Sequence, residues 1–172
     1  MKNRITPGTS EKLMRETDFI VSKTDCKGRI TYGNRIFIEF SGYAERELLG
    51  AQHNIIRHPD MPRGVFKLLW DTLGAGEECF AYVKNMARDG RFYWAFANVT
   101  ASYDERGEVV GYLSVRRAPS RAAVDVLGDV YRLMLQEEQR AGPRDACAAS
   151  LALLTRILAD KETSYERFVL SL

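Results

Sequence analysis

Two short turns that join three β-rich runs set the strictest limit on how this chain can fold. The runs cover residues 80–86, 91–102 and 108–117. The first turn, Arg88-Asp-Gly90, is a strong hairpin signal, and Asp104-Glu-Arg-Gly107 marks a second hairpin corner. Because a hairpin places consecutive strands side by side in opposite directions, this half of the chain predicts an antiparallel sheet.

A second pair of β-rich runs lies near the start of the chain. Residues 19–21 and 30–32 flank Asp25-Cys-Lys-Gly28, a turn with glycine where a positive φ is wanted. Together with the three later runs, this hairpin predicts a five-stranded antiparallel sheet.

Three helical stretches separate the two groups of strands. One opens at Asn34, and a second covers residues 44–49 before Gly50. The third follows Pro62, with apolar side chains at helical spacing, and the two prolines of residues 54–62 exclude one regular helix there. The order β-β-α-α-α-β-β-β predicts an α+β fold whose short helices cover one face of the sheet.

The two ends of the chain differ in residue composition and pattern from residues 18–118. Residues 1–17 are polar and predict a tail or a short cap helix that begins at Ser10. Residues 119–172 are rich in helix formers, with a break at Ala141-Gly142-Pro143. They predict a C-terminal helical extension, either a hairpin beside the sheet domain or a dimerisation pair.

Charge and cysteine content narrow the class of protein. The formal net charge is +2, without the basic stripe of a nucleic-acid binder, and no apolar run could span a membrane. Cys26, Cys79 and Cys147 are odd in number and scattered, which favours reduced thiols in a cytoplasmic protein. No catalytic triad, metal-ligand spacing or phosphate-binding loop is present, so we expect no enzyme.

Motifs through the first 100 residues carry a family resemblance. The first set is Asp25-x-x-Gly-Arg-Ile30, Asn34-x-x-Phe37, Ser41-Gly-Tyr43 and Glu47-Leu-Leu-Gly50. The second set is Asn54-Ile-Ile-Arg-His-Pro-Asp-Met-Pro62, Phe66-x-x-Leu-Trp70, Lys84-Asn85, Asp89-Gly90 and Tyr93-Trp94-x-x-Ala97-Asn98-Val99. In this order and spacing they resemble the FAD-binding PAS sensor domains of the aerotaxis-receptor type.

The resemblance implies a signal sensor that holds FAD without a covalent bond. The domain would respond to the redox state of the FAD or to oxygen and signal this to a protein partner. A homodimer is expected. The residues expected at the cofactor are Asn34, Arg57, His58, Asp60, Trp70, Cys79, Asn85 and Trp94. The amide of Asn85 supplies both donor and acceptor groups, which suits the edge of a flavin ring.

Several of these residues also have purely structural interpretations. Asn34 is well placed to cap its helix, and Asp60 to cap the helix after Pro62 or to pair with Arg57. Trp70 at helical spacing is typical of a core residue. Trp94 and its neighbour Tyr93 must face opposite sides of their strand.

One position departs from the family pattern, and it leaves other functions open. Cys79 stands where the pattern has a tryptophan, which implies another flavin orientation, another ligand or an empty pocket. The alternatives are a cofactor-free PAS dimerisation module and a haem sensor that uses His53 or His58. The Gly-x-Asn-Cys-Arg motif of blue-light LOV domains is absent, so no photochemical adduct is expected.

Overall fold

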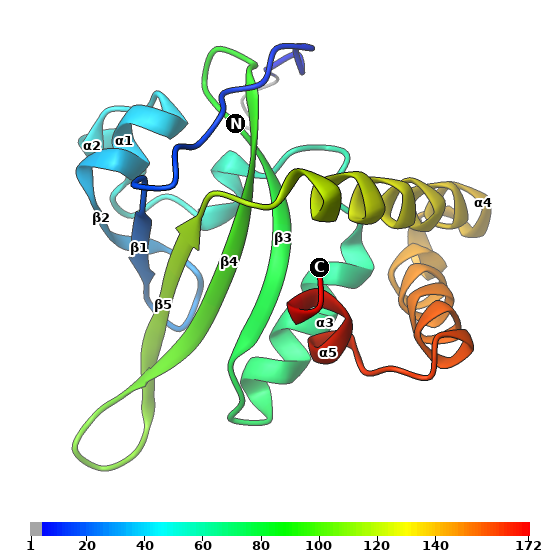
Figure 1. Ribbon diagram of the computed structural model, residues 1–172. Coiled ribbons are helices and arrows are strands. Elements are labelled where there is room, and N and C mark those ends of the chain that lie inside the picture. Colours follow the sequence, from blue (N-terminus) through cyan, green and yellow to red (C-terminus); the bar gives the residue numbers. More distant parts are fainter. Residues whose placement is uncertain (1–4) are drawn as a thin grey trace.

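A five-stranded antiparallel sheet forms the centre of the computed structural model, which describes residues 5–172. The strands are β1 (Ile20–Thr24), β2 (Ile30–Gly33), β3 (Cys79–Met86), β4 (Phe92–Tyr103) and β5 (Val109–Arg117). Their order across the sheet is β2-β1-β5-β4-β3 (Figure 1). The hairpins predicted from the turns are present, and the long-range pairing of β1 with β5 joins them into one sheet.

Four helical segments connect β2 to β3. They are α1 (Arg35–Ser41), α2 (Glu45–Leu48), the 3₁₀ turn η1 (His53–Ile56) and α3 (Arg63–Gly74). Asn34 Oδ1 accepts a hydrogen bond from the Phe37 amide at 3.0 Å, and Gly42 ends α1 with a φ of 71°. The predicted α+β fold is confirmed.

The pleat of the sheet divides its side chains between two faces. On one face Val83 and Asn85 of β3 and Arg116 of β5 point toward η1 and α3. On the opposite face Tyr82 and Trp94 point toward the C-terminal helices. We call these the inner face and the outer face.

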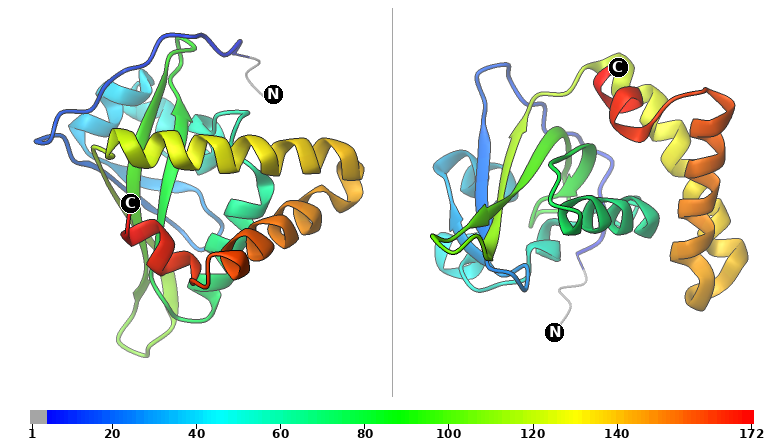
Figure 2. Two further views of the ribbon diagram at one scale, coloured as in Figure 1. Left: turned by 45° about the vertical axis from the view of Figure 1, so that its right-hand side comes forward. Right: turned by 90° about the horizontal axis from the view of Figure 1, so that it is seen from below.

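The C-terminal extension is a helical hairpin followed by one short helix. Helix α4 (Arg121–Asp160) is interrupted at Gly142, whose φ of 79° and ψ of 170° are not helical, and Pro143 begins its second half. The second half turns back from this kink and diverges from the first half (Figure 2). Helix α5 (Tyr165–Leu170), which the sequence analysis does not predict, returns to β3 and α3 (Figure 1).

The apolar side chains of α4 pack against the sheet of the same chain. Val124, Leu127 and Met134 are buried in the cluster that includes Tyr82 and Trp94. Tyr131 stacks on Trp94 with ring centroids 6.1 Å apart, and its hydroxyl donates to the carbonyl of Tyr82 at 2.8 Å. The first half of α4 therefore packs on the outer face of the sheet. Within residues 5–172, no helix is both long enough and apolar enough to cross a membrane.

Residues 5–17 contain no helix, so the predicted cap helix after Ser10 is wrong for this part of the chain. The Lys12 amide donates to the carbonyl of Phe92 at 2.7 Å, and the Glu11 carboxylate pairs with Arg121 at 2.8 Å. These long-range partners satisfy the backbone and side chains better than an isolated short helix could. Residues 1–4 of the predicted segment lie outside the described residues.

Candidate functional site

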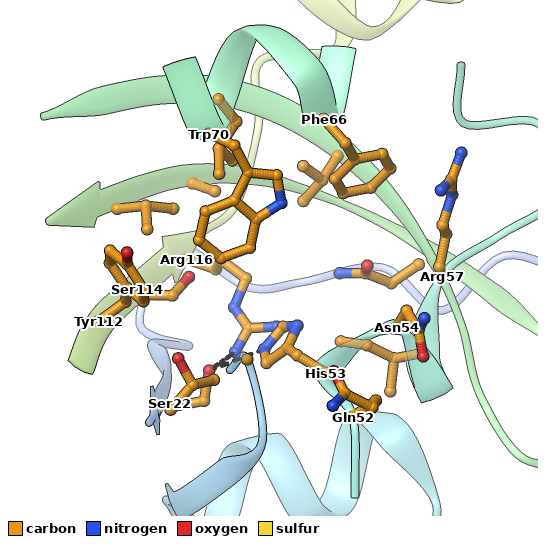
Figure 3. Close-up of a pocket in the computed structure, with 18 of the residues that line it drawn as sticks. Ser22, Gln52, His53, Asn54, Arg57, Phe66, Trp70, Tyr112, Ser114 and Arg116 are labelled. Carbon is orange, nitrogen blue, oxygen red and sulfur yellow. Dashed lines mark hydrogen bonds between the residues drawn. The ribbon is translucent and has the colours of Figure 1, made fainter. Parts of the chain in front are cut away.

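A cavity of about 520 Å³ lies between the inner face of the sheet, η1 and α3 (Figure 3). Its apolar walls come from α3 and from the central strands, and include Phe66, Leu69, Val83, Ala97 and Val99. The volume falls in the range of small-molecule and cofactor sites, which are apolar clefts with a few placed polar groups.

The charged side chains that line this cavity are all basic. They are Lys27 in the β1–β2 turn, Arg57 after η1 and Arg116 on β5, and no aspartate or glutamate belongs to the described lining. His53 adds no charge at neutral pH, because burial and the neighbouring Arg116 lower its pKa to about 3. The cavity therefore favours a ligand that is anionic or rich in hydrogen-bond acceptors.

Arg116, Ser22 and His53 form the polar floor of the cavity. Arg116 is buried, and its Nη2 donates to Ser22 Oγ at 2.6 Å, while Ser22 Oγ lies 3.0 Å from His53 Nε2 (Figure 3). The guanidinium carbon also lies 4.8 Å from the centre of the Phe37 ring. Burial lowers the pKa of Arg116 to about 10, so the side chain remains charged at neutral pH.

Asn85 and Arg57 line adjoining parts of the cavity. The two residues form an isolated antiparallel bridge, which ties the loop after η1 to β3. Asn85 Nδ2 is buried and has no hydrogen-bond partner. Arg57 lies 4.3 Å above the Phe66 ring and donates from Nη2 to the Met61 carbonyl at 2.8 Å. It makes no pair with Asp60, so that interpretation of the loop is wrong.

Trp70 is the third of the predicted cofactor residues that reaches the cavity. Its side chain projects from α3 and meets Tyr112 edge to face, with centroids 5.1 Å apart. The residue is 45% exposed, so the interpretation of Trp70 as a core residue is wrong. An aromatic ring that borders a cavity offers a surface for stacking.

Asn34, His58 and Asp60 lie away from the cavity. Asn34 caps α1, as its structural interpretation predicts. His58 Nδ1 accepts from the Asp60 amide at 3.0 Å, and Asp60 pairs with Lys84 at 2.6 Å. That ion pair, rather than capping, occupies the Asp60 side chain, because α3 has Pro62 as its N-cap.

Cys79 and Trp94 also lie outside the cavity lining. Trp94 is on the outer face under α4, because the inward position belongs to its neighbour Tyr93. Cys79 is buried against Leu69, Leu73 and the ring of Tyr165 from α5. Burial raises the pKa of Cys79 to about 11.

The floor residues are the part of the site that the sequence analysis missed. Arg116 and Ser22 carry no motif, and His53 was considered only as a haem ligand. One signal was available: Arg116 and Arg117 are consecutive on a β-strand, so one of them must point to the inner face.

Comparison with known proteins agrees with this architecture. The family model described as the PAS fold matches residues 30–116. The chain is 36% identical over 115 residues to the aerotaxis receptor of Escherichia coli (strain K12), and 28% identical over 111 residues to the nitrogen fixation regulatory protein of Klebsiella pneumoniae. These alignments cover 67% and 64% of this chain but only 22% of each relative.

Solved structures show the same fold. A structure from a study of a flavin analogue in the mechanism of a light-oxygen-voltage domain has a TM-score of 0.54 at 25% identity, covering 72% of this chain and 87% of that one. The light state of the blue-light photoreceptor Aureochrome1 LOV has a TM-score of 0.52 at 23% identity, with 72% and 92% covered. The resemblance found in the sequence motifs is confirmed, and the chain belongs to the PAS fold family.

Proposed function

We propose that this domain binds a flavin, FAD, in the cavity and reports its redox state to a protein partner in the cytoplasm. The observation that carries the proposal is the cavity itself, which combines apolar walls and basic groups with no lining carboxylate. A flavin supplies an apolar ring, a pyrimidine edge rich in acceptors and, in FAD, an anionic pyrophosphate.

The residues of the cavity suit the parts of such a ligand. Asn85 Nδ2 is a buried donor without an acceptor, which a ring edge would satisfy. Trp70 and Phe66 offer aromatic surface to the ring, and the exposed Lys27 offers a cation at the mouth for phosphate. The flavin would supply redox chemistry, while the protein residues orient it and set its electrostatic surroundings.

The same strand connects the cavity to the C-terminal helices. Asn85 of β3 faces the cavity, and the carbonyl of Tyr82 on that strand accepts the hydrogen bond from Tyr131 of α4. We infer that a changed hydrogen bond at Asn85 shifts β3 and repositions α4 and α5. A partner that distinguishes the two positions would then read the state of the ligand.

The placement of the histidines supports flavin over haem. Haem would need a histidine nitrogen facing the cavity. His53 Nε2 is engaged by Ser22 Oγ at 3.0 Å, and His58 does not belong to the described lining. The Nε2 atom of His53 is thus already in contact with a hydroxyl, and His58 lies outside the lining.

The absorbance spectrum of the purified protein, oxidised and then reduced with dithionite, tests the proposal. We expect flavin bands that bleach on reduction, either as purified or after incubation with FAD. A Soret band would indicate haem instead. A colourless protein that takes up no FAD would refute the proposal and favour the cofactor-free interaction module.

Replacing Asn85 with Ala tests the specific role of its amide. We expect weaker FAD retention in this variant. We also expect a smaller change in the hydrogen exchange of α4 when the protein is reduced. Asn98→Ala is the matched control, because Asn98 lies on the outer face and its amide contacts Glu78 at 2.8 Å. Identical behaviour of the two variants would reject the role of Asn85.

A further inference from the structure

Arg116 is a buried cation without an anionic partner among residues 5–172. Its side chain is 1% exposed, and its direct hydrogen-bond partner is the neutral hydroxyl of Ser22. Burying a charge is unfavourable unless the charge is paired and fully hydrogen-bonded. The protein alone therefore leaves this guanidinium incompletely compensated.

The groups packed around Arg116 are all neutral. Ser22 comes from β1, His53 from η1, Phe37 from α1 and Tyr93 from β4. His53 is unprotonated at neutral pH, and burial raises the pKa of Tyr93 to about 12, so its hydroxyl stays neutral. In the part of the chain that the structure describes, none of these four groups supplies the missing negative charge.

The unused donors are concentrated on one cavity. Nε and Nη1 of Arg116 are buried without partners, and so is Nδ2 of Asn85, which lines the same cavity. Arg116 occupies the floor (Figure 3), whereas Lys27 lies exposed at the mouth. A molecule that reaches the floor meets three nitrogen atoms that can donate and one fixed positive charge.

We propose that Arg116 supplies the counter-charge for the bound ligand, binding an acceptor edge of its ring system that carries negative charge. This inference rests on the proposed function for the identity of the ring as a flavin. A ring that gains negative charge on reduction then binds more tightly in its reduced form, which raises its midpoint potential in the protein. Arg116 is retained for ligand binding although it makes the empty protein less stable.

Arg116→Met tests the proposal, with Arg117→Met as the matched control. Arg117 is the next residue of β5 and is exposed, so its replacement removes an equal charge without touching the cavity. We expect Arg116→Met to weaken binding of FAD at least about tenfold, since hydrogen bonds to a charged group are worth about 1.5–3 kcal/mol. Riboflavin, which lacks phosphate, should lose affinity by a similar factor because the floor contacts the ring.

Two further readouts separate a ligand role from a structural one. The midpoint potential of bound FAD should fall in Arg116→Met and stay unchanged in Arg117→Met. The melting temperature of the ligand-free protein should rise in Arg116→Met, because a buried unpaired charge is replaced by an apolar side chain of similar volume. Arg116→Lys, which keeps the charge but not the planar donor fork, should bind both flavins with intermediate affinity.

The outcomes distinguish this inference from the proposed function. Wild-type affinity for FAD and riboflavin in Arg116→Met, or a lower melting temperature of the ligand-free variant, overturns the inference while leaving flavin binding intact. If the wild-type protein binds no flavin, the proposed function fails. The melting temperature of ligand-free Arg116→Met then shows whether the buried charge destabilises the empty protein. If Arg116→Met does not fold, wild-type flavin affinity in Arg116→Lys overturns the proposal and reduced affinity supports it.

Discussion

Burial sets the charge state of the two histidines, His53 in the cavity lining and His58 outside it. It lowers the pKa of His53 to about 3 and that of His58 to about 4, with nearby Arg116 and Lys84 acting in the same direction. Both imidazoles are therefore neutral in the folded protein at pH 7, whereas an unfolded histidine titrates near pH 6.5. The difference links the stability of the fold to pH.

Lowering the pH from 7.5 to 5 should destabilise the protein. A histidine with a depressed folded pKa contributes its full stability above pH 6.5, and that stability is lost as the unfolded state takes up protons at lower pH. For His53 the loss at pH 5 is up to about 2 kcal/mol, from about 1.4 kcal/mol per pH unit. Urea denaturation at the two pH values measures it. His53→Gln should show a smaller loss than wild type, and equal losses would contradict the assignment.

Restoring the family tryptophan at Cys79 should disturb the docking of α5. The larger indole would have to fit into the buried cluster of Cys79, Leu69 and Leu73, against which Tyr165 packs. Overpacking of this kind destabilises by about 1–3 kcal/mol. In a double-mutant cycle measured by urea denaturation, Tyr165→Ala should relieve part of the loss in Cys79→Trp. Additive effects would show that the two positions do not share this space.

Helix α3 is the element that joins the cavity to the C-terminal extension. Phe66, Leu69 and Trp70 on its cavity side line the ligand site. At its N-terminus the Glu138 carboxylate of α4 accepts from the Arg63 amide at 2.6 Å and the Gly64 amide at 3.3 Å. These amides have no partner within α3 itself, and a negative charge there also interacts favourably with the helix dipole.

Glu138→Gln should loosen the second half of α4 from α3. The neutral amide loses the charge that favours the helix N-terminus, and it weakens the charge-assisted hydrogen bonds that Ser150, Arg63 and Gly64 donate to Oε1. We expect a loss of about 1–3 kcal/mol in unfolding free energy, as for a disrupted buried hydrogen-bond group. Glu137→Gln is the control, because Glu137 pairs with Arg140 on the same helix. Faster proteolysis near Gly142 in both variants alike would contradict the special role of Glu138.

Gly64→Ala should separate α3 from α4. A Cβ at Gly64 would lie 2.5 Å from Ser150 Oγ and 2.8 Å from the Leu151 amide, so the helices must move apart. We expect a net loss of about 1–3 kcal/mol from this overpacking, measured by urea denaturation. Gly74→Ala in the same helix meets nothing within 4 Å and should be neutral or slightly stabilising. Equal stability of the two variants would contradict the close contact.

The molecule as a whole consists of one sheet with a ligand cavity on its inner face and a helical cover on its outer face. The cover comes from a segment more than 25 residues beyond Trp94 in the chain, yet it buries that indole under Tyr131. Strand β3 and helix α3 contact both the cavity and the cover. A change in the cavity therefore has a short physical route to the extension.

Removing residues 119–172 should expose the outer face of the sheet. Tyr82, Trp94 and Phe96 would then meet water, forming an apolar patch that favours self-association. We expect larger particles by light scattering and increased binding of the dye ANS compared with the full chain. A truncated chain that stays monomeric and binds no dye would show that the cover is dispensable for solubility.

Local signals predicted the strands, the main helices and the kink before Pro143, because turn residues and periodic apolar side chains act within a few residues of one another. The same signals predicted that Asn34 could act as a cap. Arg57, Trp70 and Asn85, which the motif resemblance placed at the cofactor, line the cavity. The small helix α5 was missed, since its six residues are held by contacts with β3 rather than by a pattern of their own.

The sequence alone established the antiparallel hairpins, the helices between them and the family, since each rests on short-range chemistry or on motif spacing. Tertiary packing determined which strand face holds the ligand site and what covers the other. Arg116 and Arg117 are indistinguishable along the chain, and Tyr93 and Trp94 nearly so, until β1–β5 pairing and the docking of α4 assign each to a face. The floor of the cavity joins Ser22, His53 and Arg116 from distant segments, so no local pattern could have located it.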